Sequence, residues 1–196
     1  VDVAASYPGT PSSEIFSTLA EFAEEYGYYA EWSTNEKVAL EVAAGAAYTG
    51  AKAIVSMKQV GLNVAADPLM TLAYLGVDGA LVLAVADDPG PHSSQNEQDT
   101  RHTAKLAKLP VFDPADPEEA KEMTKAAFEL SEELGMPAFI RPVTRICHGC
   151  GDVTLEEVSK ESTEFQFKKD GSKVIFPDYS YERHQWLTEK QEELKE

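Results

Sequence analysis

Residues 53–86, AIVSMKQVGLNVAADPLMTLAYLGVDGALVLAVA, decide the fold. The runs AIVSM (53–57) and ALVLAVA (80–86) are continuously apolar and of strand length, which is typical of parallel strands buried on both faces. Between them, Asp67-Pro68 has the pattern of a helix cap followed by a first-turn proline, and it opens the helical pattern LMTLAYLG (69–76). A buried strand, a helix and a second buried strand predict one βαβ unit.

The same alternation extends over the first 145 residues. Further strand-type runs are DVAAS (2–6), YYAEW (28–32) and PAFIRPV (137–143); helical patterns occupy PSSEIFSTLAEFAEEYG (11–27), NEKVALEVAAGAAYTG (35–50) and DPEEAKEMTKAAFELSEELG (116–135). Gly27 fits the position just past a helix end. Five strand-type runs that alternate with helices predict an α/β fold, with a parallel sheet and helices on both faces. We assign residues 1–151 to this domain.

Residues 152–196 differ in character. EFQFKKDGSKVIF (164–176) pairs two β-type runs around Asp170-Gly171, which predicts a β-hairpin. YSYERHQWLTEKQEELKE (179–196) predicts a charged terminal helix with Trp186 and Leu187 as its apolar anchors. We interpret the region as a linker and an arm that packs on a neighbouring domain or subunit. Because the chain starts at Val1, without Met and at the edge of a strand, we expect an N-terminally truncated fragment of a longer polypeptide.

Composition excludes several partners. The net charge of −17 argues against a nucleic-acid partner, because phosphate binding depends on lysine and arginine patches. A salt-loving source or ordinary solubility would each account for the acidity. No apolar run approaches the roughly 20 residues of a membrane helix, so we expect no membrane partner. Two cysteines cannot form a secreted disulfide framework, and we expect a cytoplasmic protein.

In open parallel sheets, ligands bind beyond the carboxyl ends of the strands. The stretch SYPGTPSS (6–13) follows the first predicted strand there. Two prolines fix φ in this stretch, and Gly9 permits close approach, so a stiff loop would present Thr10 and the amides before the helix to a ligand. It lacks the phosphate-loop and dinucleotide-binding glycine patterns. The alternative is a rigid turn capped by Ser12 or Ser13.

Glu36, at the start of the helix 35–50, is the sharpest candidate. Leu40, Ala43 and Ala47 follow it at helical spacing, so Glu36 lies on the apolar stripe of the helix. A carboxylate on a buried stripe is costly unless it is paired or protonated, which points to a functional group. Ser33-x-x-Glu36 is equally well a capping box, in which Glu36 bonds back to a free amide. The pattern leaves both interpretations open.

Four motifs together resemble a known family. YPGTPSSEI, WSTNEKVALEVAAGAAYTGAKA, MKQVGLNVAADPLMT and ADDPGPHSSQNEQDTRHTAKLAKLPVFDPADPEEA occur in the order and at the gaps of the pyrimidine-binding domain of the 2-oxoacid:ferredoxin oxidoreductases. Within that family they are most similar to the branch that oxidises indolepyruvate. The resemblance runs from Val1 to about Asp152, and more loosely beyond it.

The resemblance implies a thiamine diphosphate-dependent enzyme. In the family's domain the glutamate at the position of Glu36 hydrogen-bonds N1′ of the cofactor's aminopyrimidine ring and so promotes loss of the thiazolium C2 proton. The resemblance therefore favours the catalytic interpretation of Glu36 over the capping box. The family oxidatively decarboxylates a 2-oxoacid, transfers the acyl group to coenzyme A and passes electrons through iron–sulfur clusters to ferredoxin. The resemblance therefore implies that the larger subunit is part of an enzyme and that this fragment alone is inactive.

Site residues are carried over by motif. The Tyr-Pro-x-Thr-Pro loop implies cofactor contacts from Tyr7, Pro8, Gly9 and Thr10, and Gln59, in the loop after AIVSM, is a further cofactor candidate. Thr10 also reaches the reacting end of the cofactor, where it can contact substrate.

The sequence departs from that of the pyruvate enzymes at one place that bears on the substrate. Where the pyruvate enzymes place an arginine after the fourth strand, this chain has Asp87-Asp88-Pro89-Gly90, which favours an aryl pyruvate such as indolepyruvate over pyruvate. The polar candidates for substrate contacts are Asp88, His92, Ser93 and Asn96. The alternative for this stretch is a solvated loop that caps the next helix at Ser94.

The remaining parts of the enzyme are expected outside this chain. It lacks the Gly-Asp-Gly…Asn signature that holds the diphosphate through Mg²⁺, and it lacks the cysteine runs of 4Fe-4S clusters. A diphosphate-binding domain and a second subunit are the implied partners. The Ala- and Gly-rich helix of Glu36 predicts a homodimer contact.

The pair Cys147 and Cys150, in CHGC, permits three interpretations. It is half of a zinc site without a second pair, a redox pair without the thioredoxin context, or two incidental cysteines. We expect incidental cysteines and no metal site. Two other functions compete with the main one: another 2-oxoacid oxidoreductase or decarboxylase with the same half-site, and a non-enzymatic α/β module for assembly or ligand sensing.

Overall fold

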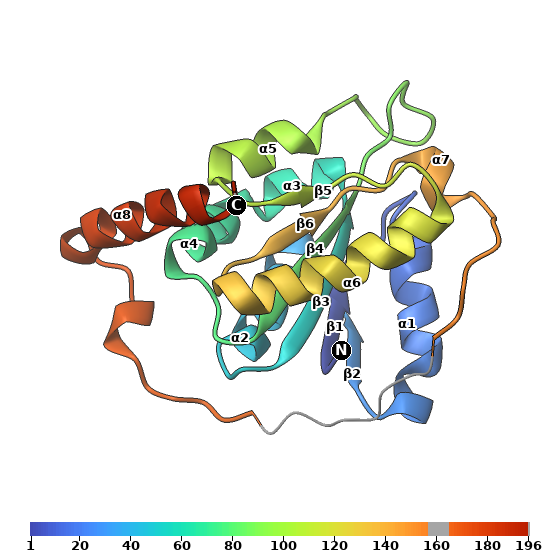
Figure 1. Ribbon diagram of the computed structural model, residues 1–196. Coiled ribbons are helices and arrows are strands. Elements are labelled where there is room, and N and C mark those ends of the chain that lie inside the picture. Colours follow the sequence, from blue (N-terminus) through green and yellow to red (C-terminus); the bar gives the residue numbers. More distant parts are fainter. Residues whose placement is uncertain (157–164, 196) are drawn as a thin grey trace.

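A single parallel sheet organises the computed structural model, which describes residues 1–156 and 165–195 (Figure 1). The strands lie in the order β2-β1-β3-β4-β6-β5. Their bounds are β1 Val3–Ser6, β2 Tyr29–Trp32, β3 Lys52–Lys58, β4 Ala80–Ala86, β5 Val111–Phe112 and β6 Ala138–Ile140. The α/β prediction and its five strands are confirmed. The sequence missed β5, because two residues are too few to show a period.

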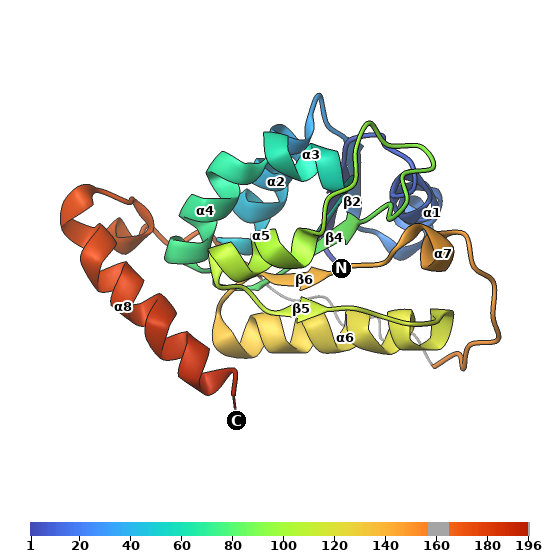
Figure 2. The same cartoon turned by 90° about the horizontal axis from the view of Figure 1, so that it is seen from above.

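Helices cover both faces of the sheet (Figure 2). Their bounds are α1 Ser13–Tyr26, α2 Glu36–Ala47, α3 Gln59–Val64, α4 Ala66–Leu75, α5 Thr100–Ala107, α6 Pro117–Leu134, α7 Thr144–Cys147 and α8 Pro177–Glu193. One core packs α2, α4 and α5 against β3 and β4 through residues such as Leu40, Leu69 and Leu83. The other packs α1 and α6 on the opposite face through Phe16 and Ala127. This alternation follows from the period of two in a strand.

Helix α6 has the ends that its sequence indicates, whereas helices α3 and α4 differ from the prediction. Helix α6 begins after Asp116, whose carboxylate accepts from the Glu119 amide at 2.9 Å, and it ends at Gly135 in the left-handed region (φ 63°). Helix α4 begins at Ala66, so the predicted cap at Asp67 is wrong; the Asp67 carboxylate lies 2.9 Å from Lys37 Nζ instead. Helix α3 was missed, because it has only six residues.

The C-terminal arm is partly as predicted. The helix is confirmed as α8, and Leu187 is its buried anchor. It packs on α4 of the same chain: Arg183 donates from Nε to Tyr74 O at 2.7 Å and from Nη2 to Leu75 O at 3.1 Å. Among residues 1–156 and 165–195, no helix has the length and apolar character needed to cross a membrane.

The predicted hairpin around Asp170-Gly171 is wrong for the described residues 165–176, which contain no strand; Glu164 lies outside the described residues. A 3₁₀ helix spans Gly171–Lys173. Lys173 Nζ lies 3.0 Å from Asp78 Oδ1 and donates to Leu75 O at 3.3 Å, which fixes this segment on the end of α4. A two-stranded hairpin alone is marginally stable, so these contacts decide the local structure. The domain division at residue 151 stays a prediction.

Candidate functional site

The sheet reverses its direction of growth beside β1. β2 lies on one side of β1, whereas β3 and all later strands lie on the other. Such a reversal, at the carboxyl ends of the strands, is where open α/β sheets bind ligands. The Ser6 hydroxyl donates to Ser56 O at 2.8 Å and joins β1 to β3 there. A Cβ added at Gly9 would lie only 2.8 Å from Lys58 Cδ, so the loop after β1 packs closely on the end of β3.

The loop after β1 is a closed turn. The Ser12 hydroxyl donates to Gly9 O at 2.7 Å, and the Gly9 amide donates to Ser13 Oγ at 2.8 Å. Both hydroxyls thus bond within the turn, and the Ser12 side chain makes no capping bond to α1. Thr10 is exposed on this turn and precedes a cis peptide bond to Pro11. The turn is closed by these hydrogen bonds and presents Thr10 at its surface, and its stiffness stays a prediction.

The rest of the Tyr-Pro-x-Thr motif shares this surface. Tyr7 and Pro8 are exposed, and Gly9 is partly buried. The four predicted cofactor residues therefore lie together beyond the end of β1. Their roles as cofactor contacts stay predictions.

Glu36 lies where the helical period predicted, on the buried stripe of α2. The side chain is buried, as are Leu40 and Ala43. Its carboxylate presses on the backbone of Gly61 in α3: a Cβ added there would lie 2.3 Å from Glu36 Oε1. Among the residues that the structure describes, none donates a hydrogen bond to this carboxylate. It is held in place by packing and is free to bond a ligand.

The capping-box alternative for Glu36 is wrong. Asn35 is the N-cap of α2, and its Oδ1 accepts from the Val38 amide at 3.0 Å. The Ser33 amide, which the box would pair with Glu36, donates instead to Ser6 O at 2.8 Å. The strand pairing of β1 and β2 therefore uses the amide that the box required.

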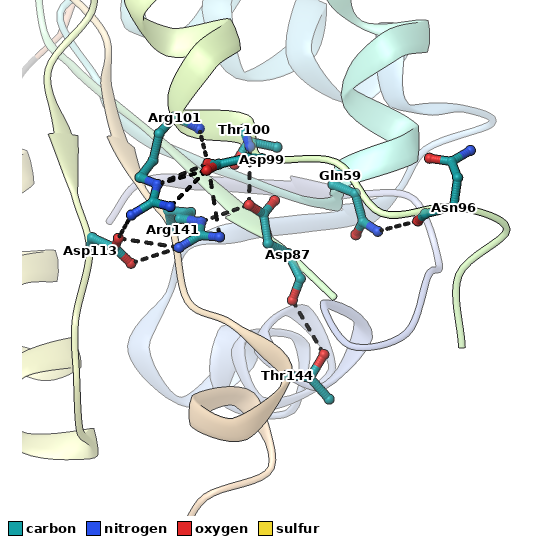
Figure 3. Close-up of polar contacts among 9 residues, drawn as sticks. All are labelled: Gln59, Asp87, Asn96, Asp99, Thr100, Arg101, Asp113, Arg141 and Thr144. Atoms are coloured by element: carbon teal, nitrogen blue, oxygen red, sulfur yellow. Dashed lines mark hydrogen bonds and ion pairs between the residues drawn. The ribbon is translucent and has the colours of Figure 1, made fainter. Parts of the chain in front are cut away.

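Gln59 is the first residue of α3, not a loop residue as the sequence suggested. Its side chain is fully buried, and Nε2 donates to Asn96 O at 3.2 Å, which joins α3 to the loop after β4 (Figure 3). Because the partner is a carbonyl, the amide must present Nε2 to it. Gln59 Oε1 is then a buried acceptor without a partner among the described residues. Buried polar atoms of this kind need a physical explanation, such as a ligand.

Asp88 anchors the loop after β4, which spans residues 88–98. Its Oδ2 accepts from the amides of His92 at 3.0 Å and Ser93 at 2.9 Å, and Oδ1 accepts from Thr144 Oγ1 at 2.7 Å. Burial raises the pKa of Asp88, but these hydrogen bonds outweigh it and hold the pKa well below the ordinary value of a carboxyl. The ionised side chain thus shapes the loop from beneath.

The other predicted substrate residues lie at the surface of this loop. His92, Ser93 and Asn96 are exposed, and the Ser93 hydroxyl donates to Thr10 O at 3.1 Å. The loop therefore meets the turn after β1, as its place beyond β4 requires. The cap expected at Ser94 is wrong: Asp99 is the N-cap of α5. The substrate roles stay predictions.

Sequence reasoning missed a buried ionic cluster below the same loop. Arg141, just after β6, donates from Nε to Asp87 Oδ2 at 2.6 Å and from Nη1 to both Asp113 oxygens at 3.2 Å (Figure 3). Asp87 is fully buried and Arg141 is 7% exposed. These three charged residues come from separate segments of the sequence, so no local motif brings them together.

As the structure describes them, the two cysteines show no sign of a catalytic or metal-binding role. Cys147 ends α7 and Cys150 is exposed, and both are free thiols. Burial, with a contribution from the nearby Glu14 carboxylate, raises the pKa of Cys147 to about 12. Such a thiol is a poor nucleophile. Within the described part of the chain, no group of three or more His, Cys, Asp or Glu side chains could hold a metal ion.

Comparison with known proteins assigns the family. The chain belongs to the family described as "Pyruvate flavodoxin/ferredoxin oxidoreductase, thiamine diP-bdg", whose model matches residues 1–188. The family inferred from the motifs is thereby confirmed.

Among relatives, the "Indolepyruvate oxidoreductase subunit IorA" of Pyrococcus horikoshii is 48% identical over 202 residues, and that of Methanothermobacter thermautotrophicus is 48% identical over 196 residues. The alignments cover all of this chain and 31% and 32% of those proteins, so the chain spans about a third of their length. A solved structure, 2-oxoglutarate:ferredoxin oxidoreductase from Magnetococcus marinus with 2-oxoglutarate, coenzyme A and succinyl-CoA bound, aligns with a TM-score of 0.64. Its identity is 17%, and the match covers 75% of this chain and 27% of that one, so it supports the fold alone.

The residues of the site fit the family's cofactor. Glu36 offers a carboxylate that no described residue hydrogen-bonds, and the missing side chain of Gly61 leaves the space that this carboxylate fills. The aminopyrimidine ring of thiamine diphosphate has a ring nitrogen and an exocyclic amine, and a buried carboxylate and an amide oxygen are suitable partners for such groups.

Proposed function

We propose that this chain is the pyrimidine-binding half of a thiamine diphosphate site in a 2-oxoacid:ferredoxin oxidoreductase that acts on indolepyruvate. The observation that carries the proposal is Glu36, a buried carboxylate at the sheet's reversal point with no described partner. The names of the relatives support the substrate. The reaction is oxidative decarboxylation to the acyl-coenzyme A, with electrons passed to ferredoxin.

Each residue has a distinct part in the proposal. When bound, thiamine diphosphate supplies a nucleophilic carbon and an electron sink for the 2-oxoacid. Glu36 holds a proton at N1′ of the aminopyrimidine, and the turn Tyr7–Thr10 contacts the reacting end of the cofactor. Gln59 Oε1, at the start of α3, offers a further hydrogen-bond acceptor to the cofactor. The exposed side chains His92, Ser93 and Asn96, shaped by Asp88, face the substrate.

The remaining components belong to other parts of the enzyme. Mg²⁺ and the 4Fe-4S clusters are assigned to a diphosphate-binding domain and a second subunit. We place the enzyme in the cytoplasm and expect a homodimer contact along α2.

The test uses the complete enzyme with all its subunits. Anaerobic reduction of a viologen dye by indolepyruvate and coenzyme A is measured for the native enzyme, for Glu36→Gln and for the matched control Glu41→Gln, an exposed glutamate of the same helix. Pyruvate and 2-oxoglutarate serve as comparison substrates. We expect Glu36→Gln to lower kcat by about 10²–10⁴-fold, as for loss of a general acid–base group, and Glu41→Gln to change it less than twofold.

Each outcome discriminates between functions. Undiminished activity in Glu36→Gln would remove the mechanism. Preference for another 2-oxoacid would reassign the substrate within the same class. If the native enzyme oxidises no 2-oxoacid, the domain is an assembly or ligand-sensing module.

A further inference from the structure

The loop 88–98 carries most of the proposed substrate residues, and its two flanking residues are both aspartates. Asp87 ends the segment after β4, and Asp99 begins α5 as its N-cap. Fixing both ends of a loop reduces the number of conformations that it can adopt. The side chains that fix these ends therefore control where the loop places its exposed groups.

Arg141, the residue after β6, lies near both ends of the loop. Its Nε lies 2.6 Å from Asp87 Oδ2, and its Nη2 lies 3.9 Å from Asp99 Oδ1. Its Nη1 bonds both oxygens of Asp113 at 3.2 Å, which ties the guanidinium to the segment after β5 (Figure 3). The planar guanidinium serves three directions at once, which the point charge of lysine cannot do.

Asp87 is bound on one side only. Its Oδ2 also accepts from the Thr100 amide at 3.0 Å, whereas Oδ1 is buried without a partner among the described residues. Gln59 Oε1 and Thr100 Oγ1 are likewise buried and without described partners. These three unsatisfied atoms lie in the first turn of α3 and at the two ends of the segment from Asp87 to Thr100. Unsatisfied buried groups reduce the stability of this one conformation, so the loop depends on the Arg141 contacts.

We propose that Arg141 is a positioning residue for the 2-oxoacid substrate: it clamps both ends of the loop 88–98 and so holds the loop in its binding conformation. This inference rests on the proposed function. Arg141 is itself buried, so we expect it not to contact the substrate. It acts on the fraction of enzyme in which the loop is correctly placed, and the apparent dissociation constant of a ligand rises in proportion as that fraction falls.

The chain offers a matched control in Arg101. It bonds the same Asp99 at 2.7 Å and the same Asp113 at 3.2 Å, but it does not contact Asp87 and its side chain is 52% exposed. Exposed ion pairs contribute little. Any effect specific to the clamp must therefore follow from Arg141 and not from Arg101.

The experiment compares Arg141→Lys with Arg101→Lys in the complete enzyme. KM and kcat are measured with indolepyruvate, and thiamine diphosphate affinity is measured by calorimetry. We expect Arg141→Lys to raise KM about tenfold, because the loop loses its fixed position in most molecules, with kcat and cofactor affinity changed less than twofold. We expect Arg101→Lys to change all three quantities less than twofold.

A second variant keeps the test decisive if the single Arg141 variant does not fold. Removal of Arg141 alone leaves a buried carboxylate unpaired, which is strongly destabilising. The double variant Asp87→Asn/Arg141→Met removes both charges together, and we expect the same rise in KM from it. An unchanged KM in both Arg141 variants, or an equal rise in Arg101→Lys, would overturn the inference. So would a parallel loss of cofactor affinity, because that indicates general structural damage. A native enzyme without 2-oxoacid activity would instead refute the proposed function, and this inference with it.

Discussion

Gly61→Ala tests the position of the Glu36 carboxylate without changing its chemistry. The added Cβ would lie 2.3 Å from Glu36 Oε1 and 2.7 Å from its Cδ and Cγ, whereas ordinary contacts begin near 3.4 Å. The carboxylate must therefore move by about 1 Å. A misplacement of that size at a reacting centre can cost about 100-fold in rate. We expect kcat/KM for the 2-oxoacid to fall by about two orders of magnitude.

Stability should respond differently from activity. Gly61 lies within helix α3, where alanine is intrinsically favoured over glycine by about 0.5–1 kcal/mol. The clash is with the Glu36 side chain from Cγ to Oε1, which must turn about its inner bonds to clear the added methyl group. We therefore expect the free energy of unfolding to change by less than about 1 kcal/mol.

The control is Gly45→Ala in helix α2. A Cβ at Gly45 meets no atom within 4 Å, so this variant gains helix propensity without a clash. Steady-state kinetics and urea unfolding of both variants give the answer. Native activity in Gly61→Ala would refute the argument that catalysis depends on where α3 holds the carboxylate.

Two further predictions concern titratable groups. Iodoacetamide at pH 8 should alkylate the exposed Cys150 at least tenfold faster than Cys147, whose pKa near 12 leaves almost no thiolate; equal rates by mass spectrometry would contradict this. Asp88→Asn should lower stability above about pH 4, because the folded-state pKa of Asp88 lies below that of an unfolded carboxyl. The difference from the native protein should shrink as pH falls below 4, and a pH-independent difference in urea midpoint would refute it.

The sequence predicted the elements that carry strong local signals. The apolar runs of β3 and β4 needed no tertiary information, because their composition alone indicates burial on both faces. The same holds for α6, where Asp116 and Gly135 mark both ends. Glu36 was found by helical period, since its place on the stripe with Leu40 was visible in one segment.

Other features depend on contacts that a local pattern cannot contain. Whether Ser33 caps α2 was undecidable, because its amide had two competing acceptors and the pairing of β1 with β2 chose between them. The Asp-Gly pair at 170–171 carried a hairpin signal, but Lys173 docks on Asp78, almost a hundred residues away. In each case a distant partner overrode a sound local preference.

The cluster of Arg141 with Asp87 and Asp113 is the clearest feature that local sequence could not predict. It also affects which charges are available to the substrate. The sequence shows an aspartate pair where the pyruvate enzymes place an arginine, which suggests that positive charge has left this edge. The structure places an arginine beneath this edge: Arg141, the residue after β6, is bound to Asp87 and Asp113. Its guanidinium is paired with the carboxylates of Asp87 and Asp113, so it is not available to bind the carboxylate of a 2-oxoacid. Substrate selection would then depend on the shape in which the clamp holds the loop 88–98, which is the quantity that the Arg141 variants measure.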